Sequence, residues 1–352
     1  MTKRPVSQLT QSQIVALALA AYLVVSPLNR SLDAQTAAPE NIVVRGEEVP
    51  SAYGAPLAFS RSRFSNLTTA YVLPPGAVFA GLIYQGDAVR FNRPDHRVTQ
   101  EIEIGLPYRF GVAIENSVEA FRGNTQERSC SFEVRYALAD WGKIPLNPTL
   151  FAEWKLGIGD ILHDEGPPAP LAKGEAQAFI DAHHPLPDAY ELRLLFSEDF
   201  AEKFEWALNA FFEQEVTGDR GREYGFAQSI MIPVFGRKAD IATTTGDKAV
   251  AETNTLPSRE RLKVGFEMQL TLFNDKGIRQ GPDATNIGES ARFVIGPTIA
   301  WKPTRNTRFD VSPLIGMTHD APRVSVFAVF SYLFGPGGEA HEGEAPASTR
   351  NR

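Results

Sequence analysis

Histidines and carboxylates gather in one stretch of the chain, and these side chains are common ligands of divalent metals. Between residues 161 and 188 lie His163, Asp164, Glu165, Asp181, His183 and His184. Their spacing corresponds to no established metal motif, and polar residues of this kind usually lie on solvated loops. We therefore expect a solvated surface loop and no metal site.

Hydrolysis is a second chemistry to consider, since a serine activated by a histidine can act as a nucleophile. None of the six histidines directly precedes a serine, and the chain has no G-x-S-x-G, H-E-x-x-H or phosphate-loop motif. Residues distant in sequence can still meet in space. From the sequence we expect no catalytic residues and no cofactor.

Charged residues recur at every second position through the mature chain, where they alternate with apolar residues. Successive side chains of a β-strand point to opposite faces, so this period predicts strands with one charged and one apolar face. Glu101 and Glu103, for example, alternate with Ile102 and Ile104. The candidates for a charged, lumen-lining face are Glu101, Glu103, Glu115, Glu133, Arg135, Glu153, Lys155, Glu191, Arg193, Glu205, Lys263, Glu267 and Arg292.

About twelve such segments follow one another, each about as long as a tilted membrane-spanning strand, and barrels of the outer membrane have an even number of strands. The sequence thus predicts an all-β fold, an antiparallel transmembrane β-barrel over 76–334 in the cell outer membrane. A soluble β-sandwich also alternates, but its strands are usually shorter. The long polar connection 235–259 falls where a short periplasmic turn is expected, and we interpret it as a mobile insertion.

The two ends of the chain differ from this pattern. Lys3 and Arg4 precede a short apolar core, which predicts a secretory signal peptide over 1–34. Residues 35–75 lack a sustained period and are predicted to be an N-terminal periplasmic segment, either a plug or a linker. The polar tail 335–352 is predicted to be disordered.

Composition excludes several classes of protein. No Lys/Arg block interrupts the mixed charges, whose net value is −7, so no nucleic-acid partner is expected. Cys130 is the only cysteine and has no partner for a disulfide within the chain. No later stretch is continuously apolar for the length of a membrane-spanning helix.

The last predicted strand, Val326–Phe334, resembles the C-terminal signal that outer-membrane barrels present to their assembly machinery. Aromatic Phe334 is preceded by apolar residues at alternate positions. The region from Ala77 to Phe334 also resembles the roughly twelve-stranded outer-membrane proteins that include the phenol-degradation meta-pathway family, which implies a channel or transport role. Ile42–Val44 resembles the segment by which TonB-dependent receptors engage their energy-coupling partner, although a linker or an edge strand explains it as well.

The charged lumen face leaves two interpretations open. Charges inside a barrel must be hydrated or paired across strands. Hydrated charges would line a water-filled pore for small solutes, whereas paired charges would fill the barrel and close it. We therefore predict a channel or transporter that contacts outer-membrane lipid, with a non-conducting structural or ligand- or partner-binding barrel as the alternative and a lipid hydrolase as a lesser one.

Overall fold

The computed structural model describes residues 52–88, 95–121, 124–160, 185–200, 203–217, 221–235, 258–274, 290–318 and 321–335. Several sequence predictions lie outside these residues. They are the signal peptide over 1–34, the segment Ile42–Val44, the histidine-containing stretch up to residue 184, and the tail from residue 336.

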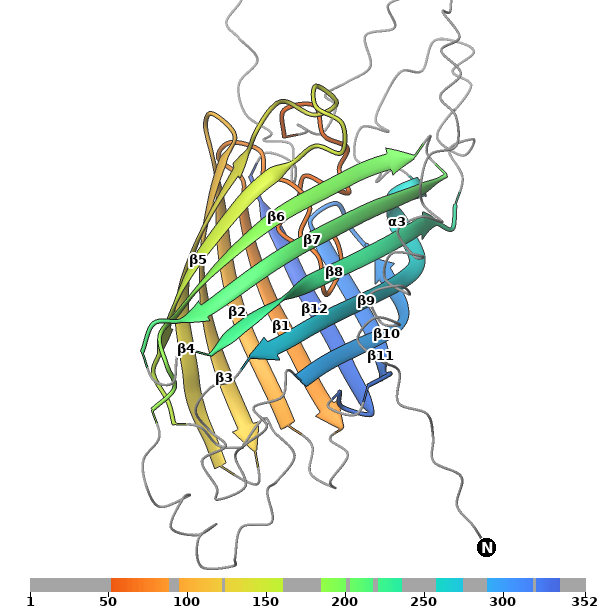
Figure 1. The fold of residues 1–352 in the computed structure, drawn as a ribbon. Coiled ribbons are helices and arrows are strands. Elements are labelled where there is room, and N and C mark those ends of the chain that lie inside the picture. The colour runs from red at the N-terminus through yellow and green to blue at the C-terminus, as the bar shows by residue number, and fades with distance from the viewer. Residues whose placement is uncertain are drawn as a thin grey trace, which may run out of the picture. The chain divides into compact units, whose positions relative to one another are not determined.

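Twelve antiparallel strands form a closed barrel within the described residues, and each strand pairs with its neighbours in the sequence (Figure 1). β1 closes the barrel by pairing with β12, where Val78 lies opposite Phe334. The prediction of an all-β antiparallel barrel of about 12 strands is therefore confirmed. The strands are β1 Val78–Ala88, β2 Asp95–Leu106, β3 Phe110–Phe121, β4 Asn124–Ala137, β5 Thr149–Gly157, β6 Ala189–Phe200, β7 Phe204–Glu215, β8 Arg222–Pro233, β9 Leu262–Asn274, β10 Ser290–Trp301, β11 Thr307–Gly316 and β12 Val324–Phe334.

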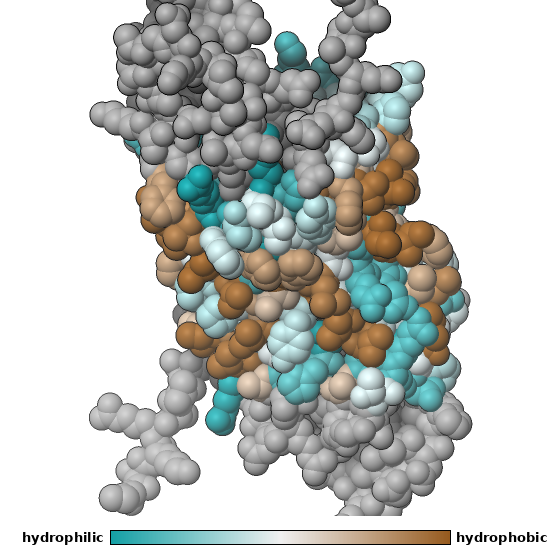
Figure 2. Space-filling view, turned by 180° about the vertical axis from the view of Figure 1, so that it is seen from behind, coloured by the Kyte–Doolittle hydropathy of each residue, from teal (hydrophilic) through white to brown (hydrophobic). Residues whose placement is uncertain are grey.

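The outside of the barrel is apolar and the inside is polar, because the period of two in the sequence is kept in the strands. On β2, Ile102 is 55% exposed while its neighbours Glu101 and Glu103 are 1% and 0% exposed. Phe266 on β9 is 62% exposed. Figure 2 shows hydrophobic side chains spread over one outer face of the barrel. Such an exterior suits contact with lipid, because a closed barrel pairs its strands with one another and presents no open sheet edge to the bilayer.

The described helix α3, Ser258–Arg261, is a single turn that leads into β9. The sequence prediction counted Ser258 and Arg259 in a mobile insertion, whereas the structure places them in this helix. Arg259 forms an ion pair with Asp199 on β6, with 2.9 Å between Nη2 and Oδ1. No helix among the described residues is long and apolar enough to cross a membrane.

Residues 52–77, called the plug segment below, lie inside the barrel before β1 begins. Ala52, Ala55, Phe59 and Tyr71 are 0% exposed. They belong to one apolar cluster with the inward-facing residues Ala137, Ala207, Met231 and Ala300 of β4, β7, β8 and β10. Because three of these four barrel residues are alanines, the wall leaves room for the bulkier side chains of the plug segment.

The plug segment leaves the lumen beside β2, at the end where β1 begins and β12 ends, called the terminal end below. The backbone N–H of Gly76 donates to the carbonyl of Gly105 at 2.8 Å. A Cβ atom added to Gly105 would lie 2.0 Å from the carbonyl oxygen of Pro74. A glycine is therefore required where the two backbones approach.

Candidate functional site

Hydrogen bonds join the polar part of the plug segment to one side of the barrel wall. The hydroxyl oxygens of Ser65 and Ser229 lie 2.7 Å apart. The side chain of Asn209 accepts from the N–H of Thr69 at 2.9 Å and donates to its carbonyl at 2.8 Å. Asn209 lies on β7 and Ser229 on β8. Side chains of the wall therefore hold the irregular stretch from Ser65 to Thr69.

The next strand, β9, supplies a carboxylate to the same stretch. Glu267 accepts from the backbone N–H of Leu67 at 2.8 Å and from the hydroxyl of Ser312 on β11 at 2.9 Å. Glu267 is 1% exposed. Its carboxylate therefore satisfies a buried donor that the non-helical, non-strand backbone of the plug segment would otherwise leave unpaired.

Guanidinium groups make further contacts between the plug segment and the wall. The guanidinium of Arg63 contacts Glu101 at 2.8 Å and Glu115 at 3.1 Å, on β2 and β3. Arg135 on β4 donates to the carbonyl of Ser62 at 2.8 Å, and Arg308 on β11 donates to the carbonyl of Phe64 at 2.6 Å. The plug segment is thus attached to strands all around the barrel.

Aromatic side chains complete the attachment near the terminal end. The rings of Phe59 and Phe64 are stacked with centroids 5.1 Å apart, and Phe59 lies 4.7 Å from Trp141. Tyr71 meets Trp141 edge-on and donates its hydroxyl to the carbonyl of Ala139. Trp141 belongs to the turn between β4 and β5, and its role in holding the plug segment has no signal in the sequence.

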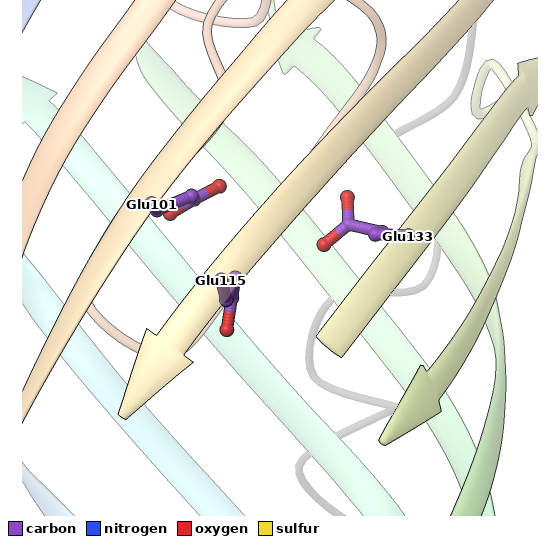
Figure 3. A group of neighbouring side chains, drawn as sticks. All are labelled: Glu101, Glu115 and Glu133. Atoms are coloured by element: carbon purple, nitrogen blue, oxygen red, sulfur yellow. The ribbon is translucent and has the colours of Figure 1, made fainter. Parts of the chain in front are cut away.

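Three glutamates, Glu101, Glu115 and Glu133, approach one another on the inner face of β2, β3 and β4 (Figure 3). Their carboxylate oxygens lie within 4.8 Å, as ligands of a cation would. Two guanidinium groups already occupy this place, since Arg63 contacts the first two glutamates and Arg135 contacts Glu133. The three carboxylates thus share two guanidinium groups within one network of ion pairs.

A second network lies further along the wall, on β5, β6 and β7. Lys155 contacts Glu191 at 2.8 Å, and it also contacts Glu153 and Glu213. Arg193 donates to Glu191 at 3.0 Å. Interior charges on this wall are therefore paired across strands, which is one of the two arrangements expected from the sequence.

The pKa values of the plug segment reflect its place inside the barrel. Burial, the largest cause, and the neighbouring Arg308 lower the pKa of Arg61 to about 10, although Glu260 and Asp310 oppose the shift. Burial also disfavours the charge of Arg63, but Glu101 and Glu115 outweigh burial and raise the pKa. Both side chains stay cationic near neutral pH, so Arg63 keeps its ion pairs.

A cavity of about 460 Å³ lies on the other side of the plug segment, away from the terminal end. Its floor includes Arg63, Asn66, Leu67 and Thr69 of the plug segment. Seven of the charged residues predicted to line the lumen also line this cavity: Glu115, Glu133, Arg135, Glu153, Lys155, Arg193 and Arg292.

The other six candidates from the sequence are buried inside the barrel and do not line the cavity. Glu101, Glu103, Glu191, Glu205, Lys263 and Glu267 are buried and contact the plug segment or other wall residues. Lys263, for example, contacts both Glu205 and Glu260 of α3. The structure therefore places all the candidates inside the barrel, but it divides them between a cavity and a closed network.

The sequence identified none of the plug residues that contact the wall, such as Arg63, Ser65, Asn66 and Thr69. Residues 60–69 read Ser-Arg-Ser-Arg-Phe-Ser-Asn-Leu-Thr-Thr, a polar run between two apolar stretches. The apolar stretches on both sides of this polar run are the one local sign that residues 52–77 pack against something, because a linker in solvent does not need apolar residues. Its partners are distant in sequence, up to 246 residues away, and no local pattern indicates them.

The closed antiparallel strand order, the apolar exterior and the charged interior together define a class of protein, a β-barrel of the bacterial outer-membrane type. Within that class this barrel carries an internal N-terminal plug segment. No protein-family model matches the chain, and no curated protein matches it.

Several solved structures show a limited likeness to the chain. An outer membrane channel from Pseudomonas putida F1 is 10% identical with a TM-score of 0.46, over 75% of this chain and 97% of that one. The NanC porin is 8% identical with a TM-score of 0.39, over 73% and 99%. The β domain of the Bordetella autotransporter Brka is 10% identical with a TM-score of 0.40, over 74% and 100%. The class of this protein follows from the closed strand order and the apolar exterior of its own barrel.

Proposed function

We propose that the protein is an outer-membrane channel for small solutes that is closed, in this conformation, by its own plug segment. The observation that carries the proposal is the cavity, which is lined by wall charges on its sides and by the plug segment at its floor. A barrel that served only as a scaffold would need no cavity above the packed segment. The solute path would run through the cavity and past the floor when the plug segment moves.

The plug segment has the contacts of a part that can be displaced. Its central stretch is held by hydrogen bonds and ion pairs, such as Ser65 to Ser229 and Arg63 to Glu101, and water can replace such contacts at a modest free-energy cost. The barrel itself is closed by the continuous ladder between β1 and β12. Displacing the plug segment would therefore leave the barrel intact.

The orientation follows from the general rule that outer-membrane barrels keep both chain ends in the periplasm. The plug segment would then close the periplasmic mouth, and the cavity would be reached from outside the cell. The segment Ile42–Val44 precedes the plug segment in sequence, so an energy-coupling partner that pulled on it would act directly on the gate.

A disulfide across the plug segment and the wall would test the proposal. In a Cys130→Ser background, Ser65→Cys and Ser229→Cys replace two hydroxyls that lie 2.7 Å apart, near enough for a disulfide to form after a small adjustment. Conductance of the full chain would be recorded in planar bilayers. We expect no conductance above background in the oxidised protein and channel openings after reduction.

Two controls make the result decisive. Each single cysteine variant should conduct alike with and without reductant, because it cannot form the intramolecular bond. Equal conductance of the double variant before and after reduction would reject gating by the plug segment. Absence of openings in the reduced protein, and also in a variant lacking residues 46–72, would reject the channel.

The last outcome would favour the second candidate, a non-conducting barrel that binds a ligand in the cavity. The specific observation for it is that the plug segment fills the lumen with residues that are 0% exposed, including Phe59 and Tyr71. Both candidates use the same cavity, and conductance separates them.

A further inference from the structure

Arg292 on β10 is a cation of the cavity wall for which the described residues supply no counterion. It lines the cavity, and no carboxylate contact, hydrogen bond or ion pair is present for it among the described residues. Its Nε atom is buried and has no hydrogen-bond partner there. Other cations of the wall are paired, as Lys155 is with Glu191 and Arg193 is with the same glutamate.

A neighbouring ring holds the Arg292 guanidinium in place. The guanidinium carbon lies 4.9 Å from the centroid of the Phe273 ring on β9, within the range of a cation–π contact. Phe273 is 7% exposed, so this ring is itself held by packing. Because a ring face satisfies no N–H group, the donors at the guanidinium edge stay available to a planar anion.

A hydroxyl lies beside this guanidinium. Thr271 is the cross-strand partner of Arg292, both residues line the cavity, and directly opposed side chains of antiparallel strands lie within contact distance. The Oγ1 atom of Thr271 accepts from Gln269 at 3.3 Å. A hydroxyl that accepts one hydrogen bond can still donate its own proton, so Thr271 offers a second donor to the same anion.

The wall next to these donors is apolar, unlike the wall of paired charges on β3 to β7. An apolar cluster there consists of Val294, Leu314 and Ala321. Phe327 on β12 and Leu67 of the plug segment pack against this cluster. Val294, Ala321, Phe327 and Leu67 all line the cavity. This side of the cavity therefore combines one cation with no counterion among the described residues, one hydroxyl and a cluster of apolar side chains.

We propose that the cavity binds small organic anions, with a carboxylate held by Arg292 and Thr271 and an apolar body against Val294 and Phe327. The guanidinium of Arg292 is partly buried and has no counterion among the described residues, so an anion that neutralised it would be stabilised there, and a carboxylate matches its planar donor edge. The inference deepens the proposed function, since it names the class of solute for the same lumen.

Three probes that share one apolar body would test the role of charge: 4-phenylbutyrate, its neutral amide 4-phenylbutanamide, and the cation 4-phenylbutylamine. Titration calorimetry on the folded full chain in detergent would measure their affinities. We expect 4-phenylbutyrate to bind about tenfold more tightly than the amide, as a charge-assisted hydrogen bond implies, and the amine to bind no more tightly than the amide.

Variants assign this preference to Arg292. Arg292→Gln should remove the preference for the carboxylate over the amide, whereas Arg292→Lys keeps the charge and should retain part of it. Arg222→Gln is a matched control, because Arg222 lies outside the cavity lining and is exposed, and it should leave the preference unchanged. Heat-modifiable migration in electrophoresis would verify that each variant has a folded barrel.

The results separate this inference from the proposed function. Carboxylate binding that is absent or no tighter than amide binding, or an unchanged preference in a folded Arg292→Gln variant, would overturn the inference. Selective carboxylate binding by a protein that never conducts would support the inference and reject the channel.

Discussion

The side chain of Asn209 offers the sharpest single perturbation of the proposed gate. It is 1% exposed, and it both accepts from and donates to the backbone of Thr69, at 2.9 and 2.8 Å. Asn209→Ala removes both bonds and leaves a backbone donor and a backbone acceptor of the plug segment without their partner.

The size of the effect follows from these two contacts. An unsatisfied buried polar group costs about 1–3 kcal/mol. Thr69 also borders the cavity, so water can replace part of the loss, and we take about 2 kcal/mol in total for the closed state. The open state lacks the contact in either protein. The ratio of open to closed channels should therefore rise about 30-fold.

Single-channel recording in planar bilayers would measure this ratio as the fraction of time spent open. Asn116→Ala is the matched control and should leave the ratio unchanged. Asn116 lies between the inward-facing Glu115 and Ser117, and its side chain donates a hydrogen bond to Glu127 on β4, not to the plug segment. A folded Asn209→Ala variant with the open fraction of the wild type would refute the view that these bonds hold the plug segment closed.

Further perturbations test the networks around the gate. Arg135→Met removes the guanidinium that contacts Glu103, Glu133 and, beside Arg63, Glu101, so we expect a loss of about 3–5 kcal/mol in the free energy of unfolding. Denaturant unfolding would measure the loss, and Arg109→Met, which removes the solvent-accessible pair of Arg109 and Asp140, is a control that should change the free energy of unfolding far less. Gly105→Ala would place a Cβ atom 2.0 Å from the Pro74 carbonyl oxygen and should expose the plug segment to protease. In Gly111→Ala the nearest atom to the added Cβ is a side-chain oxygen of Glu103 at 3.1 Å and the backbone stays 3.9 Å away, so this variant should be cleaved at the wild-type rate. Deletion of residues 42–45 should reduce uptake by cells without altering conductance in bilayers if an energy-coupling partner acts there, and unchanged uptake would retire that partner.

The barrel could be predicted from the sequence because its wall obeys a local rule. The charged residues Glu101 and Glu103, for example, alternate with the apolar residues Ile102 and Ile104. Such alternation is visible within a few residues, and it determines which side chains face lipid. Closure follows from the repetition of such segments, since an open edge cannot be tolerated in a bilayer.

The lumen could not be predicted in the same way, because its state depends on partners far apart in sequence. Glu267 and Arg292 look alike as alternating charges, yet the first accepts a hydrogen bond from the backbone of Leu67, and the second stacks on the ring of Phe273 without an ion pair to the described residues. Cross-strand register and the path of an irregular segment decide such differences. The alanines at 137, 207 and 300 similarly gain a meaning only when the plug segment is packed against them.

The central claim is that the plug segment closes a channel, and the conductance of the Ser65→Cys/Ser229→Cys protein in a Cys130→Ser background tests it most directly. The account predicts conductance at background while the disulfide is intact and openings once it is reduced. Openings of equal frequency in the oxidised and reduced protein would contradict it.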